Sequence, residues 1–133
     1  MRLLLDTHAF LWSFSQPKKL PKIARDAIED QSNEVFVSAV SFWEISIKVS
    51  IGKLEPVGKH PAEAVEVARS LGFNPIPLLP EVAASYGNLT ENTHFDPFDR
   101  MLIWQAISQR LTVVSGDSDF SKFKKDGLKL LWK

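Results

Sequence analysis

The sequence contains no cysteine, and this absence excludes several kinds of chemistry at once. Among its 133 residues there is no thiol for a disulfide, a thiolate metal site or a cysteine nucleophile. No apolar stretch approaches the roughly 18 residues that a membrane-spanning helix needs. The first segment, MRLLLDTHAF, is interrupted by Asp6 and His8, so we do not expect a signal peptide. These absences favour a cytoplasmic protein that does not enter a membrane.

The sequence also lacks a net charge. Sixteen Lys and Arg residues balance 16 Asp and Glu residues, which gives a formal net charge of zero. A nucleic-acid binder that relies on bulk charge would be basic. Attraction for a phosphate backbone must therefore come from local basic patches or from a metal held by acidic side chains. The length and a hydrophobic content of 44% predict one domain over residues 1–133 with a sizeable core.

Short apolar runs alternate with amphipathic stretches, a pattern that is typical of an α/β fold. The expected strands are 2–5, 34–37, 73–78, 111–114 and 128–132. The expected helices are 8–14, 22–30, 40–51, 62–70, 80–89 and 97–110, with a helical turn at 120–124 and a loop at 58–61. The first strand is almost uniformly apolar, so we expect it to be buried on both faces. Pro75 and Pro77 place the third strand at an edge or make it short.

Acidic side chains recur where the chain passes from strand to helix. Asp6 and Asp117 directly follow apolar runs, and Glu44 and Asp99 lie near expected helix starts. The carboxyl ends of parallel strands share one edge of a sheet, where ligands bind, so these acids can converge. Like charges that are packed together resist ionising. A divalent cation with oxygen ligands is the simplest reason for such a cluster.

The first two acids also have purely structural explanations. Asp6 can cap the helix that follows it, a role that Asp favours. Ser41 and Glu44 match the capping-box pattern, in which the glutamate reaches back to the cap amide. Either role is compatible with a carboxylate that also reaches a site at that end of the helix.

The remaining acids are ambiguous in the same way. Asp96 can cap a helix in which Asp99 occupies the first turn, and Arg100 can pair with an acid or with a phosphate oxygen. One of Asp117 and Asp119 can form an Asx-turn or cap a helix. A cap needs only one acid, so the second one is not explained by it. Together, the positions match a divalent-metal site for phosphoryl chemistry.

Other kinds of site are not indicated. The three histidines, His8, His60 and His94, are scattered and lack zinc spacing. There is no glycine-rich phosphate loop and no nucleophile elbow. We expect the tryptophans to be core residues rather than base-stacking platforms, and they are Trp12, Trp43, Trp104 and Trp132.

Four blocks of the chain together resemble the PIN-domain family, and within it the VapC-type toxins of bacterial toxin–antitoxin pairs. They are LLLDTHAFLW, SFWEISIKVSIGKL, HFDPFDRMLIWQA and LTVVSGDSDFSKF. The resemblance covers essentially the whole chain and implies a three-layer α/β/α fold with a central parallel sheet. It also implies Mg²⁺- or Mn²⁺-dependent cleavage of RNA, a homodimer and a separate antitoxin chain.

The resemblance assigns roles to particular residues. The acidic quartet that holds the metal and supports catalysis consists of Asp6, Glu44, Asp99 and Asp117. The family pattern does not settle whether the additional acids Asp96 and Asp119 take part. We expect supporting roles beside the site for the hydroxyls of Thr7, Ser41 and Ser115 and for Arg100. The candidates for contacts with flanking phosphates are Lys48, Lys53 and Arg100.

Three alternatives remain to be weighed. Response-regulator receivers need an adjacent pair of acids after the first strand, and haloacid-dehalogenase phosphatases need Asp-x-Asp there, whereas this chain has Asp6-Thr7-His8. The third alternative is a PIN module that binds RNA or a partner protein without catalysing a reaction. Metal-dependent loss of intact RNA distinguishes the nuclease from the binding module.

Overall fold

Five short strands form one sheet in which every neighbouring pair is parallel, in the order β3-β2-β1-β4-β5. The computed structural model describes residues 1–58 and 60–133, and the expected loop at 58–61 contains the one residue that lies outside this description. The strands are β1 Arg2–Leu5, β2 Glu34–Ser38, β3 Asn74–Ile76, β4 Thr112–Val114 and β5 Lys129–Leu131. The prediction that β1 is buried on both faces is confirmed, and so is the edge position of the short strand β3.

The connections between strands are mostly helical. The α-helices are α1 Thr7–Ser15, α2 Lys22–Glu29, α3 Ala39–Ser50, α4 Glu63–Ser70, α5 Pro80–Ala84 and α6 Pro97–Gln109. The 3₁₀ segments are η1 Pro17–Lys19, η2 Tyr86–Asn88 and η3 Ser118–Asp126. The helix expected over 80–89 is therefore interrupted after Ala84, because Ser85 ends α5 and Gly87 disfavours continuation.

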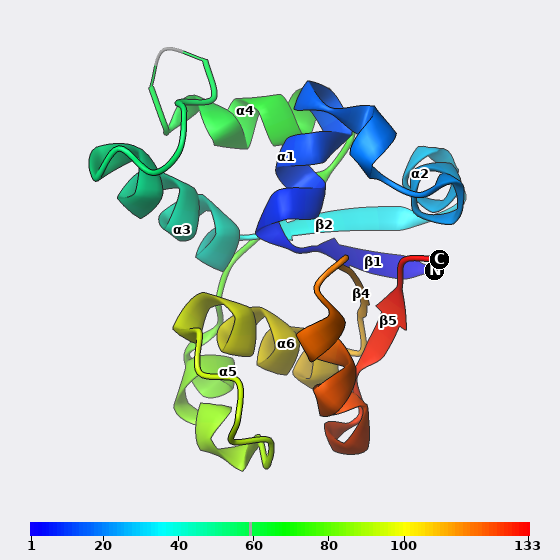
Figure 1. Cartoon of the computed structure of the whole chain (residues 1–133), viewed down its shortest axis with the longest axis vertical. Coiled ribbons are helices and arrows are strands. Elements are labelled where there is room, and N and C mark those ends of the chain that lie inside the picture. The colour runs from blue at the N-terminus through cyan, green and yellow to red at the C-terminus, as the bar shows by residue number, and fades with distance from the viewer. Residues whose placement is uncertain (59) are drawn as a thin grey trace.

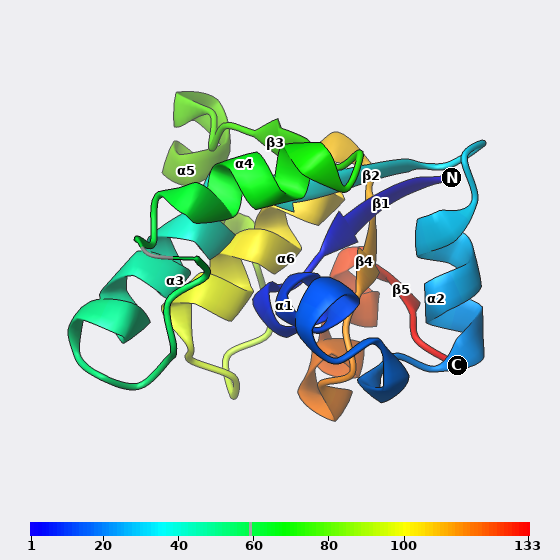
Figure 2. The same ribbon diagram turned by 90° about the horizontal axis from the view of Figure 1, so that it is seen from above.

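The helices cover both faces of the sheet, which confirms the predicted three-layer α/β/α arrangement. Helices α1, α2 and α4 lie on one face, and α5, α6 and η3 lie on the other (Figures 1 and 2). Successive side chains of β1 alternate between the two cores, because neighbouring residues of a strand point to opposite faces. Leu3 and Leu5 join the first core and Leu4 joins the second, all fully buried.

One expectation about burial is wrong. Trp43, expected in the core, is 62% exposed and contacts Phe98 edge-on, with ring centroids 5.1 Å apart. Across the described residues, the helices are too short or too polar to span a bilayer.

Candidate functional site

The four predicted acids line one cavity at the carboxyl edge of the sheet. Asp6 follows β1, and Asp117 follows β4. The second turn of α3 brings Glu44, and the first turn of α6 brings Asp99, to the same place. The cavity has a volume of about 320 Å³, and its lining residues are Asp6, Thr7, His8, Trp12, Glu44, Lys48, Asp96, Asp99, Gly116 and Asp117. Five carboxyl groups thus face one lysine and one histidine.

Asp6 caps α1 and also faces the cavity. Its Oδ1 accepts a 2.7 Å hydrogen bond from the backbone N–H of Ala9, so the cap explanation is confirmed. The residue is only 8% exposed. Burial raises the pKa of the Asp6 carboxyl, and the nearby charge of Glu44 adds to this, although the hydrogen bond from Ser115 opposes the shift. The charged form of Asp6 is therefore costly unless a cation stabilises it.

Glu44 is not a capping-box residue, and that part of the sequence interpretation is wrong. Helix α3 begins at Ala39, and Ser38 is its N-cap, with Oγ accepting a 3.0 Å hydrogen bond from the backbone N–H of Val40. Glu44 therefore lies in the second turn, too far along the helix to reach the cap amide. It is nevertheless 4% exposed, so its burial needs another explanation.

That explanation is a set of polar contacts between α1 and α3. The Thr7 hydroxyl donates a 2.6 Å hydrogen bond to Glu44 Oε1, and Thr7 Oγ1 lies 3.1 Å from Ser41 Oγ. Lys48 forms an ion pair with Glu44 Oε2. Partial burial lowers the pKa of Lys48, but its hydrogen bond to Glu44 and the surrounding acids outweigh burial and raise the pKa overall. Thr7 and Ser41 thus lie beside the acids, as expected.

At the start of α6, Asp96 caps the helix and Asp99 provides a largely buried carboxyl group. Asp96 is the N-cap, because its Oδ1 accepts a 2.9 Å hydrogen bond from the backbone N–H of Asp99, and Pro97 follows at the first helical position, as predicted. Burial raises the pKa of the Asp99 carboxyl to about 6, even though a hydrogen bond with His94 lowers it. The charges of Asp96 and Glu44 contribute to the increase.

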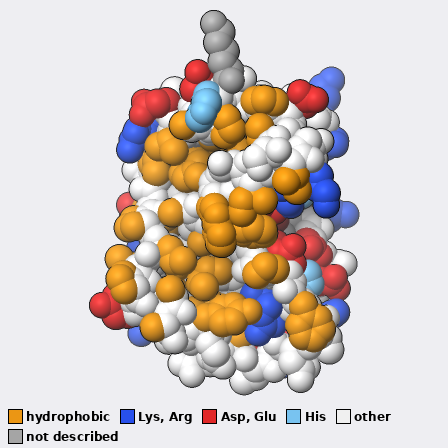
Figure 3. Space-filling view, turned by 90° about the vertical axis from the view of Figure 1, so that its left-hand side faces the viewer, with side chains coloured by type: hydrophobic (Ala, Val, Ile, Leu, Met, Phe, Trp, Pro, Cys, Tyr) orange, Lys and Arg blue, Asp and Glu red, His pale blue; other side chains and the backbone are white. Residues whose placement is uncertain are grey.

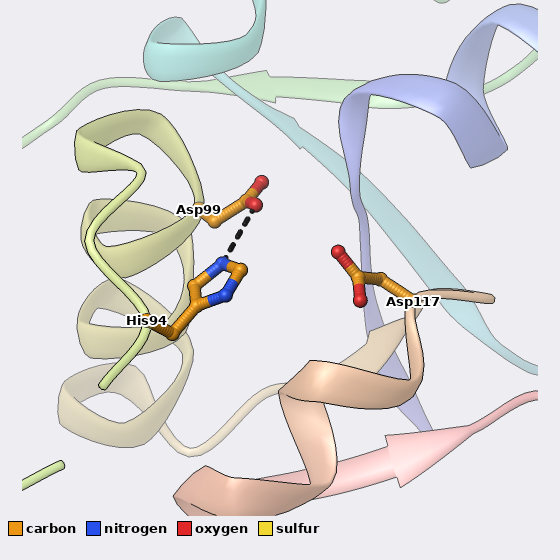
Figure 4. Close-up of side chains that lie close together, drawn as sticks. All are labelled: His94, Asp99 and Asp117. Atoms are coloured by element: carbon orange, nitrogen blue, oxygen red, sulfur yellow. Dashed lines mark hydrogen bonds and ion pairs between the residues drawn. The ribbon is translucent and has the colours of Figure 1, made fainter. Parts of the chain in front are cut away.

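His94 lies among the acids, although the sequence did not assign it to the site. Its Nε2 lies 3.0 Å from Asp99 Oδ2 (Figure 4). Its Nδ1 lies 3.6 Å from Asp119 Oδ2. Among the described residues, one ligand atom each of His94, Asp99 and Asp117 lies within 4.8 Å of the others. Asp6 and Glu44 line the same cavity but do not join this tight group. The available signal was the position of His94 in HFDPFDR, just before two of the acids.

The last two acids lie on the η3 side of the cavity. Asp117 is exposed and caps η3, with Oδ1 accepting a 2.9 Å hydrogen bond from the backbone N–H of Asp119, which confirms the expected turn. Ser115 Oγ in turn accepts a 3.1 Å hydrogen bond from the backbone N–H of Asp117. Asp119 does not line the cavity and instead pairs with Lys122 at 3.2 Å.

Arg100 has a different role from the one expected. Its Nε donates to the Tyr86 hydroxyl at 2.7 Å, and its Nη1 donates to the backbone oxygens of Glu91 at 2.6 Å and His94 at 3.0 Å. The expected pairing with an acid of the site is therefore wrong. Arg100 is buried and attaches the segment that carries His94 to α6. Lys53, also considered for phosphate contacts, does not line the acid cavity, whereas Lys48 does.

A larger cavity of about 520 Å³ lies elsewhere, at the amino end of β2. It is lined in part by Arg25, Asn33 and Phe73 and contains none of the predicted site residues. The carboxyl edge of the sheet remains the candidate site, because ligands bind at that edge in open α/β folds.

Comparisons with known proteins agree with this geometry. The sequence profile of the PIN domain matches residues 3–126. Ribonuclease VapC22 of Mycobacterium tuberculosis is 29% identical over 118 residues, which cover 86% of each chain. Among solved structures, a chain of VapBC2 from Rickettsia felis, bound to a promoter DNA fragment, aligns over 100% of both chains with a TM-score of 0.75 and 17% identity. A chain of DNA-bound VapBC from Salmonella typhimurium aligns over 98% of this chain and 97% of its own, with a TM-score of 0.70 and 16% identity.

Proposed function

This chain belongs to the PIN domain family, and on that premise we propose that it is a Mg²⁺- or Mn²⁺-dependent endoribonuclease. We take residues 1–133 as a single PIN domain that acts as the toxin of a toxin–antitoxin pair. The observation that carries the proposal is the convergence of Asp6, Glu44, Asp99 and Asp117 on one cavity at the carboxyl edge of the sheet. Its relative in Mycobacterium tuberculosis, named a ribonuclease, supports the same activity.

The donor set fits a hard divalent cation. Five of the side chains that line the cavity carry carboxylates, which are the ligands that Mg²⁺ and Mn²⁺ prefer. Burial raises the pKa of Asp6 and of Asp99, so both resist ionising in the chain alone. A cation held by the quartet would stabilise their charged forms. When bound, it supplies a water of lowered pKa and stabilises charge that develops on the phosphate oxygens.

The chain's own residues position these carboxylates. Thr7 holds Glu44 by a hydrogen bond, and His94 holds Asp99. Such supporting contacts fix the orientation of ligands and are commonly worth 10–100-fold in affinity or activity, as an order of magnitude. We assign His94 and Thr7 as positioning residues. We assign Asp96 as the cap of α6 and Asp119 as the partner of His94 and Lys122, rather than as ligands of the cation.

The direct test is incubation of the purified protein with total cellular RNA, with Mg²⁺ or with excess EDTA. We expect a few discrete fragments with Mg²⁺ and intact RNA with EDTA. A few fragments are expected because a chain with zero net charge lacks strong non-specific attraction for RNA. Intact RNA in both tubes would favour the non-catalytic binding module, and uniform degradation of all RNA would contradict selective cleavage.

A cognate antitoxin is the proposed protein partner. The solved VapBC structures that share this fold support it. The acid cavity carries more carboxyl groups than cations, so a partner segment that inhibits the site is expected to place a basic side chain there. The test is co-purification with the product of a neighbouring gene, and addition of that product should abolish RNA cleavage.

A homodimer is the proposed assembly, formed through an apolar side of the molecule. Hydrophobic side chains gather on the side that carries α3 and α5 (Figure 3). Trp43, Ile51 and Leu79 are 62%, 58% and 40% exposed, and covering such surfaces is a common reason for association. Light scattering should give twice the chain mass, and Trp43→Glu should give the monomer mass. A wild-type monomer at micromolar concentration would exclude the dimer.

We also propose that the protein acts in the cytoplasm.

A further inference from the structure

A second cavity of about 300 Å³ adjoins the acid cavity. The two share Gly116 and Asp117, the turn that connects β4 to η3. The second cavity continues between η3 and the end of β5, and Ser118, Lys124 and Trp132 line it. In Figure 1 these elements lie on the opposite side of the molecule from α3 and α5. A dimer formed through the apolar side would therefore leave this cavity open.

Two indole rings flank the turn that carries Asp117. Trp12 lines the acid cavity and Trp132 lines the second one, and their ring centroids are 6.2 Å apart. Gly116 lies against Trp132 so closely that an added Cβ would come within 2.6 Å of its Cζ2. Both indoles are partly exposed. Each cavity therefore offers an aromatic surface next to the acids.

The lysines of η3 are not equivalent. Lys122 pairs with Asp119 at 3.2 Å, and Lys125 pairs with Glu91 at 3.1 Å. The ammonium group of Lys124 has no hydrogen bond or ion pair within residues 1–58 and 60–133, and Lys124 lines the second cavity. A cation without a partner, beside a hydroxyl group and an indole, matches the phosphate, sugar and base of a nucleotide.

We propose that the second cavity binds a nucleotide that neighbours the cleaved phosphate in single-stranded RNA. Lys124 contacts its phosphate, assisted by Ser118, and its base stacks on Trp132. Stacking on an aromatic ring requires an unpaired base, so this subsite selects loops and single strands over duplexes. The inference rests on the proposed ribonuclease function and adds the side chains that hold a nucleotide beside the cleaved bond.

The test uses the full chain and a short, end-labelled, single-stranded RNA of mixed sequence. Binding is followed by fluorescence anisotropy in EDTA at several salt concentrations, and cleavage is followed separately with Mg²⁺. The variants are Lys124→Gln, Trp132→Phe and Trp132→Leu. The matched control is Lys129→Gln, because Lys129 is exposed, lies at the amino end of β5 and does not line the cavity.

If the inference holds, Lys124→Gln lowers the salt dependence of binding, so that the slope of log K against log salt falls by about 0.7. Its KM rises while kcat stays unchanged, and Lys129→Gln behaves as wild type. Trp132→Leu weakens binding at least about fivefold, and Trp132→Phe retains most of it. Binding to duplex RNA is weaker than to the single strand and does not change with Lys124→Gln.

The inference is overturned if Lys124→Gln and Lys129→Gln bind alike, or if the wild type does not bind single-stranded RNA. Lys124 is exposed, so its variant should fold, and circular dichroism checks this. Failure of the proposed function is seen separately, as wild-type protein that binds the RNA in EDTA yet leaves it intact with Mg²⁺. In that case the difference in salt slope still decides whether the second cavity holds a nucleotide.

Discussion

The Thr7 hydroxyl donates a 2.6 Å hydrogen bond to Glu44 Oε1, so the first residue of α1 holds a buried carboxylate of α3 in place. Both residues are at most 5% exposed. Thr7 follows Asp6 directly in the sequence. One step of the chain therefore provides one acid of the site and the support for another.

Replacement of Thr7 by valine keeps its shape and removes the donor. We expect the free energy of unfolding to fall by about 1.5–3 kcal/mol, the range for a hydrogen bond to a charged group. Cleavage should fall by roughly 10–100-fold, because Glu44 loses its orientation. Denaturant unfolding and initial cleavage rates measure the two effects. Thr7→Ser retains the hydroxyl, so its stability and cleavage rate should stay near those of the wild type. A Thr7→Val variant with wild-type stability and cleavage would show that Thr7 does not position Glu44.

Glu44→Gln separates a metal ligand from a structural glutamate. Glutamine keeps the size and can still accept the hydrogen bond from Thr7, but it lacks the negative charge. We expect the cleavage rate to fall by more than about 100-fold, beyond what a supporting contact explains, while the circular dichroism spectrum is retained. Glu34→Gln, an exposed position at the amino end of β2, is the control. Wild-type activity in Glu44→Gln would place Glu44 outside the quartet.

The raised pKa of Asp99 predicts a pH dependence of stability. In the folded chain its pKa is about 6 against an ordinary value of 3.8, so between these values the folded state holds a proton that the unfolded state releases. The stability of the metal-free protein should therefore fall as pH rises from about 4 to about 6.

Mg²⁺ should reverse this trend, because it binds the charged carboxylate. The gain in melting temperature on adding Mg²⁺ should be small below pH 5 and larger above about pH 6. Thermal unfolding in EDTA and in Mg²⁺ across this range measures both effects. In Asp99→Asn, both the stability without metal and the gain on adding Mg²⁺ should depend less on pH. An unchanged pH profile in that variant would contradict the assignment to Asp99.

Arg100→Met tests the structural role of this arginine. The change leaves the carbonyls of Glu91 and His94 and the Tyr86 hydroxyl without their donor. We expect the free energy of unfolding to fall by about 2–4 kcal/mol. Because Arg100 is buried and does not face the cavity, the salt dependence of RNA binding should stay as in wild type. A smaller salt slope would instead support the phosphate contact considered from the sequence.

Local patterns predicted the strands and the positions of three acids well. The uniformly apolar run of β1 indicated a strand buried on both faces. Asp6, Asp96 and Asp117 all cap the segments that follow them. These features depend on a few consecutive residues, so they can be recognised in a single sequence. The convergence of the acids followed from the shared edge of a parallel sheet.

The sequence-based predictions were wrong where a contact between residues far apart in the sequence determines the local structure. Ser38 and Ser41 are both plausible caps for α3, and the helix begins after Ser38, whose hydroxyl also donates to Gln105 Oε1 at 2.6 Å. The roles of Arg100 and His94 likewise depend on the fold of the segment between η2 and α6, which has no periodic pattern. Local spacing could not indicate these contacts.

The most direct test of the account is the magnesium dependence of RNA cleavage by wild type and by Asp117→Asn. Asp117 is exposed, and asparagine also caps helical segments well, so the variant should fold normally and differ only in its ligand charge. We predict that wild-type cleavage saturates with Mg²⁺ and vanishes in EDTA, while Asp117→Asn needs at least about tenfold more Mg²⁺ or shows no cleavage. A variant with the wild-type magnesium curve, or full wild-type activity in EDTA, would contradict the acidic metal site.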